Sequence, residues 1–578
     1  MLPAHLKRYI VEQDYSRYTP VDQEVWRYIM RQLKDFLSEY AHPCYVDGLE
    51  KTGIEIDRIP DIEVMSQKLE KFGWRAIPVS GFIPPAAFME LQSLGYLPIA
   101  SDMRSLDHLL YTPAPDIVHE AAGHAPILVD PDFAAYLKTY AQVASKAIIG
   151  SEDMAQYEAI RILSDMKEDP NSGAPEILAA ETKLNAITKS ISNISEAALL
   201  GRMNWWTVEY GLIGTLDAPK IFGAGLLSSI GEAKACLDAE VKKIPLSIDC
   251  INYSYDITEP QPQLFVTPDF NRLREVLEEL AEMMSFRRGG VMGLERAKLA
   301  QTVNTVELNS GLEISGRLAD YQTDGEEAAY IQFQGPTQLS LAGSELQGHG
   351  IRYHSQGFGS PVGLLENSQV CLSAMRDSDL HSRGIEKGVK AELRFANGTN
   401  VDGEVTGFTR SSSGRVLLIS FKDCTVTRKG KILFEPAWGT FDMAVGSQIT
   451  SVFGGPADRK AYGETDDFVA KTIPRAAAPP AQVQNRRRLY GEIRDIRGGI
   501  ASGSLERNQE TSSRLESILK SVQTDFPNDW LLFLDLCEIS RLLPSQSWRR
   551  QAETCLHDLA QKNPSFKAQI ENGLRLIP

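Results

Sequence analysis

Two histidines that flank a glutamate could hold a metal ion. They are His119 and His124 in the stretch His-Glu-Ala-Ala-Gly-His, and the glutamate is Glu120. Imidazole is a good ligand for iron, copper or zinc. Pro115 and Asp116 stand where a helix would begin, and such a helix would give both histidines a rigid mount.

The five-residue interval between these histidines limits the kind of site that they can form. Two residues five apart lie roughly 140° apart around an ideal helix of about 3.6 residues per turn. Both can reach one metal only if the helix ends or distorts between them, which Gly123 permits. The zinc-protease pattern has its histidines four apart on one helical face. The interval therefore counts against a zinc peptidase, although it leaves other hydrolytic metal sites open.

Glu209 is the candidate for a third metal ligand. It lies in Asn-Trp-Trp-Thr-Val-Glu-Tyr-Gly-Leu, an apolar and aromatic stretch. Burying a carboxylate in such surroundings is costly unless it is paired or bound to a metal. Two imidazoles and one carboxylate form the facial set that binds iron(II) and leaves coordination positions open. Spacing alone leaves this assignment a candidate.

A second pair of histidines, His349 and His354, has the same five-residue interval. This pair lies in a glycine-rich region, without a proline-started helix and without an adjacent carboxylate. We interpret it as structural.

The elements that would carry the first pair are mainly helical. Apolar residues at three- and four-residue intervals predict an amphipathic helix over residues 20–40, and the same period occurs in 130–210 and 269–300. Residues 246–266 are richer in β-branched and aromatic residues and could form a small hairpin. We expect a mainly α catalytic domain at residues 1–300.

The remaining sequence changes in texture after residue 302. Runs at 330–333 and 416–421 are typical of strands, and similar surroundings recur 87 residues apart, which is consistent with a duplicated β-unit. Helical spacing returns near the C-terminus. We expect a β-rich domain at 301–470, a linker at 471–504 and a small α-helical C-terminal region at 505–578.

Composition excludes several classes of function. The formal net charge of -16 argues against nucleic acid as a partner, and the basic run Arg486 to Arg488 is typical of a solvated charge run. Seven scattered cysteines without a CxxC pair indicate neither a disulfide framework nor a thiolate zinc site. We see no membrane span and no targeting segment, so a cytoplasmic location is expected.

Several motifs, taken together, resemble the aromatic amino acid hydroxylase family over roughly residues 18–290. They occur in the family's order. They are Pro78-Val-Ser-Gly81, Tyr111-Thr-Pro113, the His119 to His124 core, Thr207-Val-Glu-Tyr-Gly211, the run from Gly223 to Ser229, and Gln261-Pro262 before Phe265-Val266.

The resemblance implies iron(II) held by His119, His124 and Glu209. It also implies that a tetrahydropterin, either tetrahydrobiopterin or a relative of it, and O2 serve to hydroxylate the ring of an aromatic amino acid. The residues implied at the pterin are Gly81, Phe82, Ile83, Phe88 and Glu120, with Glu120 as the catalytic group. The residues implied at the amino acid are Arg104, Thr112, Pro115, Trp205, Ser228 and Ile257.

The chemistry of these residue types fits the implied roles. Arg104 offers a bidentate fork for a carboxylate, and an aliphatic Ile257 near the ring suits phenylalanine, or tryptophan, better than tyrosine. Hydroxylation of tryptophan or of a modified amino acid, a zinc hydrolase and an inactive scaffold remain the alternatives.

Two features depart from the family pattern. The interval from His124 to Glu209 is 85 residues, about twice the usual one, so we expect added helices at about 150–194. Asn204 stands where the family commonly has a tyrosine.

Overall fold

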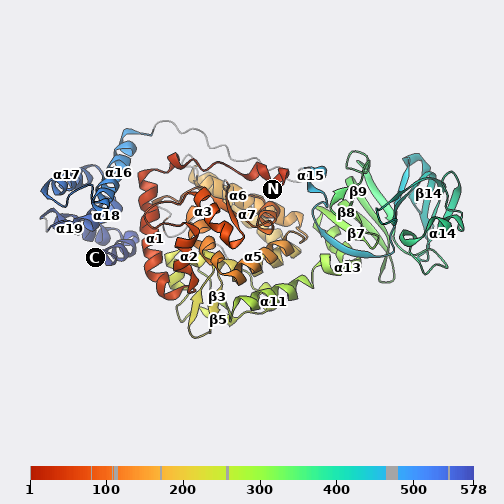
Figure 1. The fold of residues 1–578 in the computed structure, drawn as a ribbon, viewed down its shortest axis with the longest axis horizontal. Helices are drawn as coiled ribbons and strands as arrows, with labels where there is room; N and C mark the ends of the chain where they lie inside the picture. Colours follow the sequence, from red (N-terminus) through yellow and green to blue (C-terminus); the bar gives the residue numbers. More distant parts are fainter. Residues whose placement is uncertain are drawn as a thin grey trace.

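The computed structural model describes residues 2–79, 81, 83–106, 109, 115–168, 172–255, 260–463, 479–544 and 547–577. Figure 1 shows helices of the first 300 residues in the centre, a β-rich part on one side and the C-terminal helices on the other. Three of the expected site residues, Phe82, Thr112 and Ile257, lie outside the described residues.

The helix predicted over residues 20–40 is confirmed as α1, Pro20–Tyr40, whose first turn is closed by a capping box between Thr19 and Asp22. The helices that follow up to residue 300 are α2 Cys44–Thr52, α3 Ile62–Leu69, α4 Pro85–Ser93, α5 Pro131–Ala144, α6 Ser151–Glu168, α7 Ala174–Ser190, α8 Glu196–Asn204, α9 Ala224–Leu227, α10 Ile230–Ala235, α11 Phe270–Ala281, α12 Ser285–Arg288 and α13 Gly290–Ala300.

Two small sheets accompany these helices. Strands β1 (Arg75–Val79) and β2 (Tyr96–Ala100) pair in parallel. The other sheet has the order β4-β3-β6-β5. Its strands are β3 Leu212–Gly214, β4 Pro219–Ile221, β5 Lys242–Pro245 and β6 Gln263–Thr267. The expectation of a hairpin within 246–266 is wrong for the described residues, because β6 pairs in parallel with both β5 and β3.

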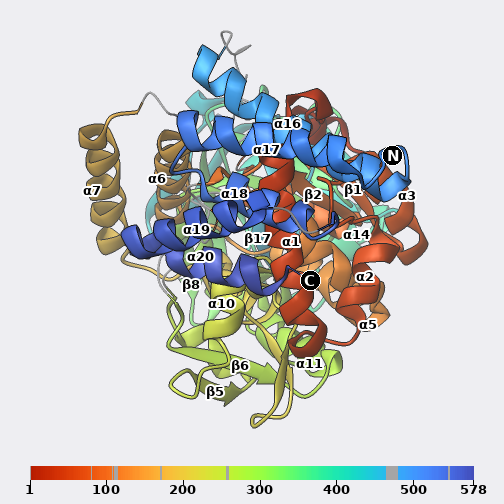
Figure 2. The ribbon, with the colours of Figure 1, turned by 90° about the vertical axis from the view of Figure 1, so that its left-hand side faces the viewer.

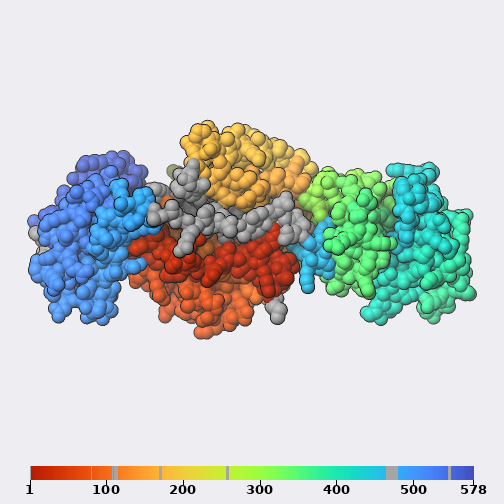
Figure 3. All heavy atoms as spheres, turned by 90° about the horizontal axis from the view of Figure 1, so that it is seen from above, coloured from red at the N-terminus to blue at the C-terminus, as the bar shows by residue number. Residues whose placement is uncertain are grey.

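Helices α6 and α7 fill the segment where added helices were expected. They lie side by side at one edge of the molecule (Figure 2), and α7 buries none of its residues. Seen from above, this hairpin projects beside the body of the molecule (Figure 3). Because Tyr157 of α6 also lines the cavity described below, the hairpin takes part in the wall of the candidate site.

The β-rich part consists of two units that share the pairing of five strands, and the first unit has one further strand, β17, which pairs with β7. The first has the order β10-β9-β8-β7-β17 with β11 on β9, and the second has the order β12-β13-β14-β15 with β16 on β14. The strands are β7 Val303–Leu308, β8 Leu312–Asp324, β9 Glu327–Leu341, β10 Ser344–Glu345, β11 Gly357–Pro361, β12 Lys390–Arg394, β13 Thr399–Arg410, β14 Val416–Arg428, β15 Lys431–Phe434, β16 Phe441–Ala444 and β17 Ile449–Gly454.

The offset between the two units supports the interpretation as a duplicated β-unit. Strands β7 and β12 begin at residues 303 and 390, β8 and β13 at 312 and 399, and β10 and β15 at 344 and 431. Each difference is 87 residues. Two short helices, α14 (Asp377–His381) and α15 (Arg459–Tyr462), complete this part.

The C-terminal helices begin earlier than expected. Residues 471–504 were expected to be a linker, yet α16 runs through Ala481–Ser502, and the remaining helices are α17 Gln509–Asp525, α18 Trp530–Ser540, α19 Ser547–Lys562 and α20 Pro564–Arg575. The basic run is also not simply solvated, because Arg486 Nε is 2.7 Å from Asp529 Oδ2. The prediction of a linker was wrong because α16 carries few apolar residues and so resembles a polar segment in the sequence. In the structure these few residues lie on one buried face of the helix.

A buried ion cluster docks these helices on α1. Arg497 Nη1 donates to Glu24 Oε2 at 2.7 Å, and Arg27 of α1 pairs with Glu538 of α18. The apolar cores of the two parts are continuous across this contact. Within the described ranges, no helix is both long enough and apolar enough to cross a membrane.

Candidate active site

A π-helix carries the first histidine pair. Its residues are Val118–His124, and the Asp116 side chain accepts from the backbone N–H of His119 at 3.0 Å at its start. In a π-helix the backbone bonds to the fifth residue along, so residues five apart lie much closer to one face than they do in an α-helix. The predicted distortion is therefore confirmed, and it brings His119 and His124 to the same face.

Gly123 was expected to permit the distortion of the helix, but the structure shows a different need for a glycine at this position. A Cβ at this position would lie 2.6 Å from the backbone oxygen of Ala224 in α9. The glycine thus allows the π-helix to approach α9 closely, and the distortion of the helix comes from its π-type turns.

The three candidate metal ligands converge. His119 Nε2 and His124 Nε2 are 3.2 Å apart, and the carboxylate of Glu209 lies 3.4 Å from the first and 3.5 Å from the second. Glu209 ends a second π-helix, Trp205–Glu209, which follows α8. Two imidazole nitrogens at about 2.1 Å from one ion lie about 3.0–3.4 Å apart at usual ligand angles. The arrangement fits a single metal ion.

The hydroxyl of Ser228 fixes the orientation of His119. It donates to the backbone oxygen of Ala224 at 2.8 Å, so it can accept from His119 Nδ1, which is 3.1 Å away. With its proton on Nδ1, His119 presents the lone pair of Nε2 to the metal position. Ser228 was expected at the amino acid, and the structure places it directly behind a candidate metal ligand.

The electrostatics of the three residues favour a positive charge between them. Burial would lower the pKa of His119, but the ion pair with Glu209 outweighs burial and raises this pKa to about 9. Burial would raise the pKa of Glu209, but His124 and His119 lower it to about 2. Burial lowers the pKa of His124 to about 4. A proton on His119 therefore occupies the place that a metal ion would take.

Glu120 differs from the other acidic group. Burial raises its pKa to about 8, and the nearby negative charges of Glu209 and Asp116 add to this effect. Its Oε2 is buried with no hydrogen-bond partner among the described residues and lies 4.0 Å from His124 Nε2. At neutral pH the metal-free carboxyl group keeps its proton, so it can donate a hydrogen bond.

One cavity of about 540 Å³ collects the predicted site residues that the structure describes. It lies between β1, α4, the two π-helices and α9. The predicted residues that line it are Gly81, Ile83, Phe88, Arg104, Pro115, His119, Glu120, His124, Trp205, Glu209 and Ser228. The geometry brings these residues together, and their individual roles remain predictions.

Arg104 is held by Asp116, which the sequence had suggested only as a residue at the start of a helix. Asp116 accepts from Arg104 Nε and Nη2, both at 2.7 Å, and from its backbone N–H at 3.1 Å. Both side chains are buried. Asp116 therefore orients the guanidinium group while it also accepts from the backbone at the start of the π-helix, and the burial that makes this pair necessary cannot be read from the sequence.

Aromatic neighbours of Trp205 were also not predicted. Its ring is stacked against Tyr255, with centroids 4.3 Å apart, and against Tyr210 at 4.5 Å. Asn204, where the family commonly has a tyrosine, places its Nδ2 3.5 Å from Glu209 Oε1. Tyr255 follows a 3-10 turn 46 residues after Glu209, so only the folded chain brings it to the cavity.

Comparisons with known proteins agree with the motifs. The family of biopterin-dependent aromatic amino acid hydroxylases matches residues 9–159 and 178–312. Phenylalanine-4-hydroxylase of Mesorhizobium japonicum is 30% identical over 275 residues, which are 47% of this chain and 83% of that protein. The enzyme of Pseudomonas aeruginosa is 29% identical over 271 residues, which are 46% of this chain and 86% of that protein.

A solved structure of phenylalanine hydroxylase from Chromobacterium violaceum, with bound iron(III) and 7,8-dihydrobiopterin, is similar at 25% identity. The similarity covers 49% of this chain and 88% of that one, with a TM-score of 0.38. The family assignment rests on the sequence matches. This chain belongs to the biopterin-dependent aromatic amino acid hydroxylases and is a phenylalanine hydroxylase-like enzyme.

Proposed function

We propose that this chain converts L-phenylalanine to L-tyrosine with iron(II), a tetrahydropterin and O2. The observation that carries the proposal is the convergence of His119, His124 and Glu209 within one cavity that is also lined by those predicted pterin and substrate residues that the structure describes. The relatives named above are phenylalanine-4-hydroxylases, and the Chromobacterium violaceum enzyme, whose structure holds iron, is 28% identical over 268 residues.

Iron(II) would be held by the two Nε2 atoms and the carboxylate, leaving open positions at which O2 can be activated together with the pterin. The chain itself contributes orientation. Ser228 holds the ring of His119, and Asn204 lies beside Glu209. Both neighbours restrict the ligands to the geometry that one ion requires.

The substrate would be bound through its charged and its aromatic ends. Arg104, held in a fixed plane by Asp116, presents a guanidinium edge for the amino acid carboxylate. Pro115 and Trp205 provide apolar surface for the ring. Because Asp116 already engages two donors of Arg104, the substrate carboxylate would use the remaining ones.

Glu120 would act on the pterin side. Its carboxyl group lines the cavity, and in the metal-free chain burial raises its pKa to about 8. A cation bound at the neighbouring ligands lowers the pKa of such a carboxyl group, so metal binding favours release of its proton.

A turnover assay tests the proposal. The full chain is supplied with iron(II), tetrahydrobiopterin, air and L-phenylalanine, and L-tyrosine is measured by chromatography. We expect tyrosine only when iron and pterin are both present, and more than about 100-fold less of it from the His119→Ala variant. Pterin oxidation without tyrosine, together with hydroxylation of L-tryptophan, would identify a different substrate. Zinc in place of iron without pterin consumption would contradict the proposed reaction.

A further inference from the structure

The second histidine pair lies in the β-rich part, on the loop between β10 and β11. The backbone oxygens of His349 and His354 accept from the N–H groups of Leu339 and Thr337, at 2.9 and 3.1 Å. Both donors belong to β9, so a single strand holds the backbone of both histidines. His349 Nδ1 and His354 Nε2 end 3.2 Å apart.

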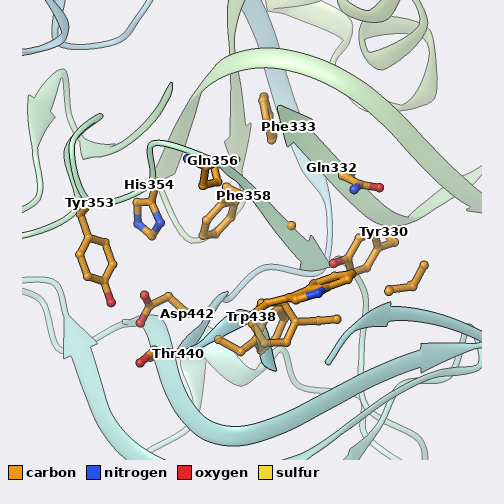
Figure 4. A pocket seen from close by; sticks show the side chains of 15 residues that line it. Tyr330, Gln332, Phe333, Tyr353, His354, Gln356, Phe358, Trp438, Thr440 and Asp442 are labelled. Carbon is orange, nitrogen blue, oxygen red and sulfur yellow. The ribbon is translucent and has the colours of Figure 1, made fainter. Parts of the chain in front are cut away.

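A buried carboxylate from the other β-unit faces this pair. Asp442 lies on β16, which pairs with β14, and Ser420 Oγ of β14 donates to Asp442 Oδ1 at 2.5 Å. Asp442 is 6% exposed and His354 is 8% exposed. Figure 4 shows the Asp442 carboxylate and the His354 ring pointing toward one another, with the Tyr353 hydroxyl beside them.

The spacing of these atoms is that of metal ligands. One ring nitrogen of each histidine and one carboxylate oxygen of Asp442 lie within 4.8 Å of one another, the same limit that the first cluster meets. The 3.2 Å separation between the ring nitrogens falls within the range of about 3.0–3.4 Å for two imidazoles on one ion. A hydrogen bond between two neutral rings would also explain this separation, whereas a metal ion would in addition account for the Asp442 carboxylate lying beside both rings.

We propose that His349, His354 and Asp442 form a second binding site for a divalent transition metal ion, built across the two β-units. Imidazole nitrogens and one carboxylate suit zinc, iron, cobalt or nickel rather than magnesium or calcium. A divalent ion bound by two neutral histidines and one carboxylate keeps a net charge of plus one, which a further anionic ligand can neutralise.

The site has room for such ligands. His354 and Asp442 line a cavity of about 480 Å³ between the two β-units. Its other walls are largely aromatic and include Tyr330, Phe358 and Trp438. With three protein ligands, the ion keeps open positions toward this cavity for water or an anion. Because the cavity joins both units, a bound ion would also tie them together.

Metal titration of the full chain tests this site. The protein is stripped with a chelator and titrated with Co²⁺, whose visible absorption reports nitrogen and oxygen ligation, and the bound metal is counted after gel filtration. We expect a second equivalent of metal beyond the one lost in His119→Ala. His354→Ala should lose this second equivalent and keep the first. Only one equivalent, removed by His119→Ala, would overturn the proposal.

Two further variants serve as controls, one for misfolding of the protein and one for metal binding by exposed histidines. Asp442→Asn keeps the size of the side chain and its hydrogen bond with Ser420, so it should fold like the parent and still bind the second ion more weakly. His381→Ala removes an exposed histidine of the same part that pairs with Glu386 at 2.7 Å, and it should keep both equivalents. Loss of the second equivalent in His381→Ala, or an unchanged affinity for the second ion in Asp442→Asn with an unchanged melting temperature, would contradict the proposed ligands.

Discussion

The two histidine pairs share one interval in the sequence but are held by different kinds of structure. His119 and His124 lie on one π-helix, with their rings edge to face at 86°. His349 and His354 lie on a loop fixed by β9, with their rings stacked at 20°. Despite these differences, the ring nitrogens are 3.2 Å apart in both pairs.

The carboxylates of the two clusters also arrive by different routes. Glu209 follows His124 by 85 residues and comes from a second π-helix, while Asp442 follows His354 by 88 residues and comes from a strand of the other β-unit. The bare five-residue interval between two histidines therefore does not by itself indicate a metal site. The tertiary structure decides whether a carboxylate completes it.

The largest effect expected is on turnover. His119→Ala should lower tyrosine formation by more than about 100-fold, because even residues behind a metal ligand change activity by about 10- to 100-fold. His381→Ala, which removes an exposed histidine of the β-rich part, should keep the parent rate. Tyrosine is measured by chromatography at saturating iron. Equal rates in the two variants would mean that the first pair is not the catalytic metal site.

An intermediate effect, on the free energy of unfolding, is expected when a glycine beside each histidine pair is replaced by alanine. Gly123→Ala would place a Cβ 2.6 Å from the rigid backbone oxygen of Ala224, whereas Gly350→Ala would meet only the side chain of Glu345. We expect Gly123→Ala to lower the free energy of unfolding by about 1–3 kcal/mol. Gly350→Ala should cost less, because a side chain can move away.

Thermal or urea unfolding of the metal-free variants measures this difference. A larger loss in Gly350→Ala than in Gly123→Ala would mean that the loop of the second pair is the more rigid mount.

The smallest effect is expected from two serines that hold a ligand in each cluster. Ser228 accepts from His119, and Ser420 donates to Asp442. Ser228→Ala should weaken iron binding about 10-fold, and Ser420→Ala should weaken binding of the second metal by a similar factor, because each removes the partner that orients a ligand. Competition with a chelator measures both affinities. Weakening of both metals by either single variant would show that the two sites are coupled.

Much of the first site follows from the sequence. The motif from His119 to His124 and the stretch that ends at Glu209 offered three candidate ligands, and the family resemblance implied that they bind one metal ion, because residue type and local order are preserved in the chain itself. The helix at Pro20–Tyr40 and the strands within β9 and β14 also followed from apolar spacing. The linker expected at 471–504 did not, because the buried face of α16 is narrow.

Other parts of the site could not be read from the chain. Asp116 as the partner of Arg104, Ser228 behind His119 and Tyr255 against Trp205 all depend on distances between separate elements. The interpretation of His349 and His354 as structural rested on the lack of a nearby carboxylate in the sequence. Asp442, 88 residues further on, now provides one.

The sequence by itself determined the family, the candidate iron ligands and the types of secondary structure, because these depend on residue identity and on local periodicity. Only the tertiary structure decided that a π-helix aligns the first histidines and that a strand from a second β-unit completes the other cluster. The physical reason is that metal ligation depends on distances of a few ångströms between side chains. Such distances are set by packing between elements, which no local pattern encodes.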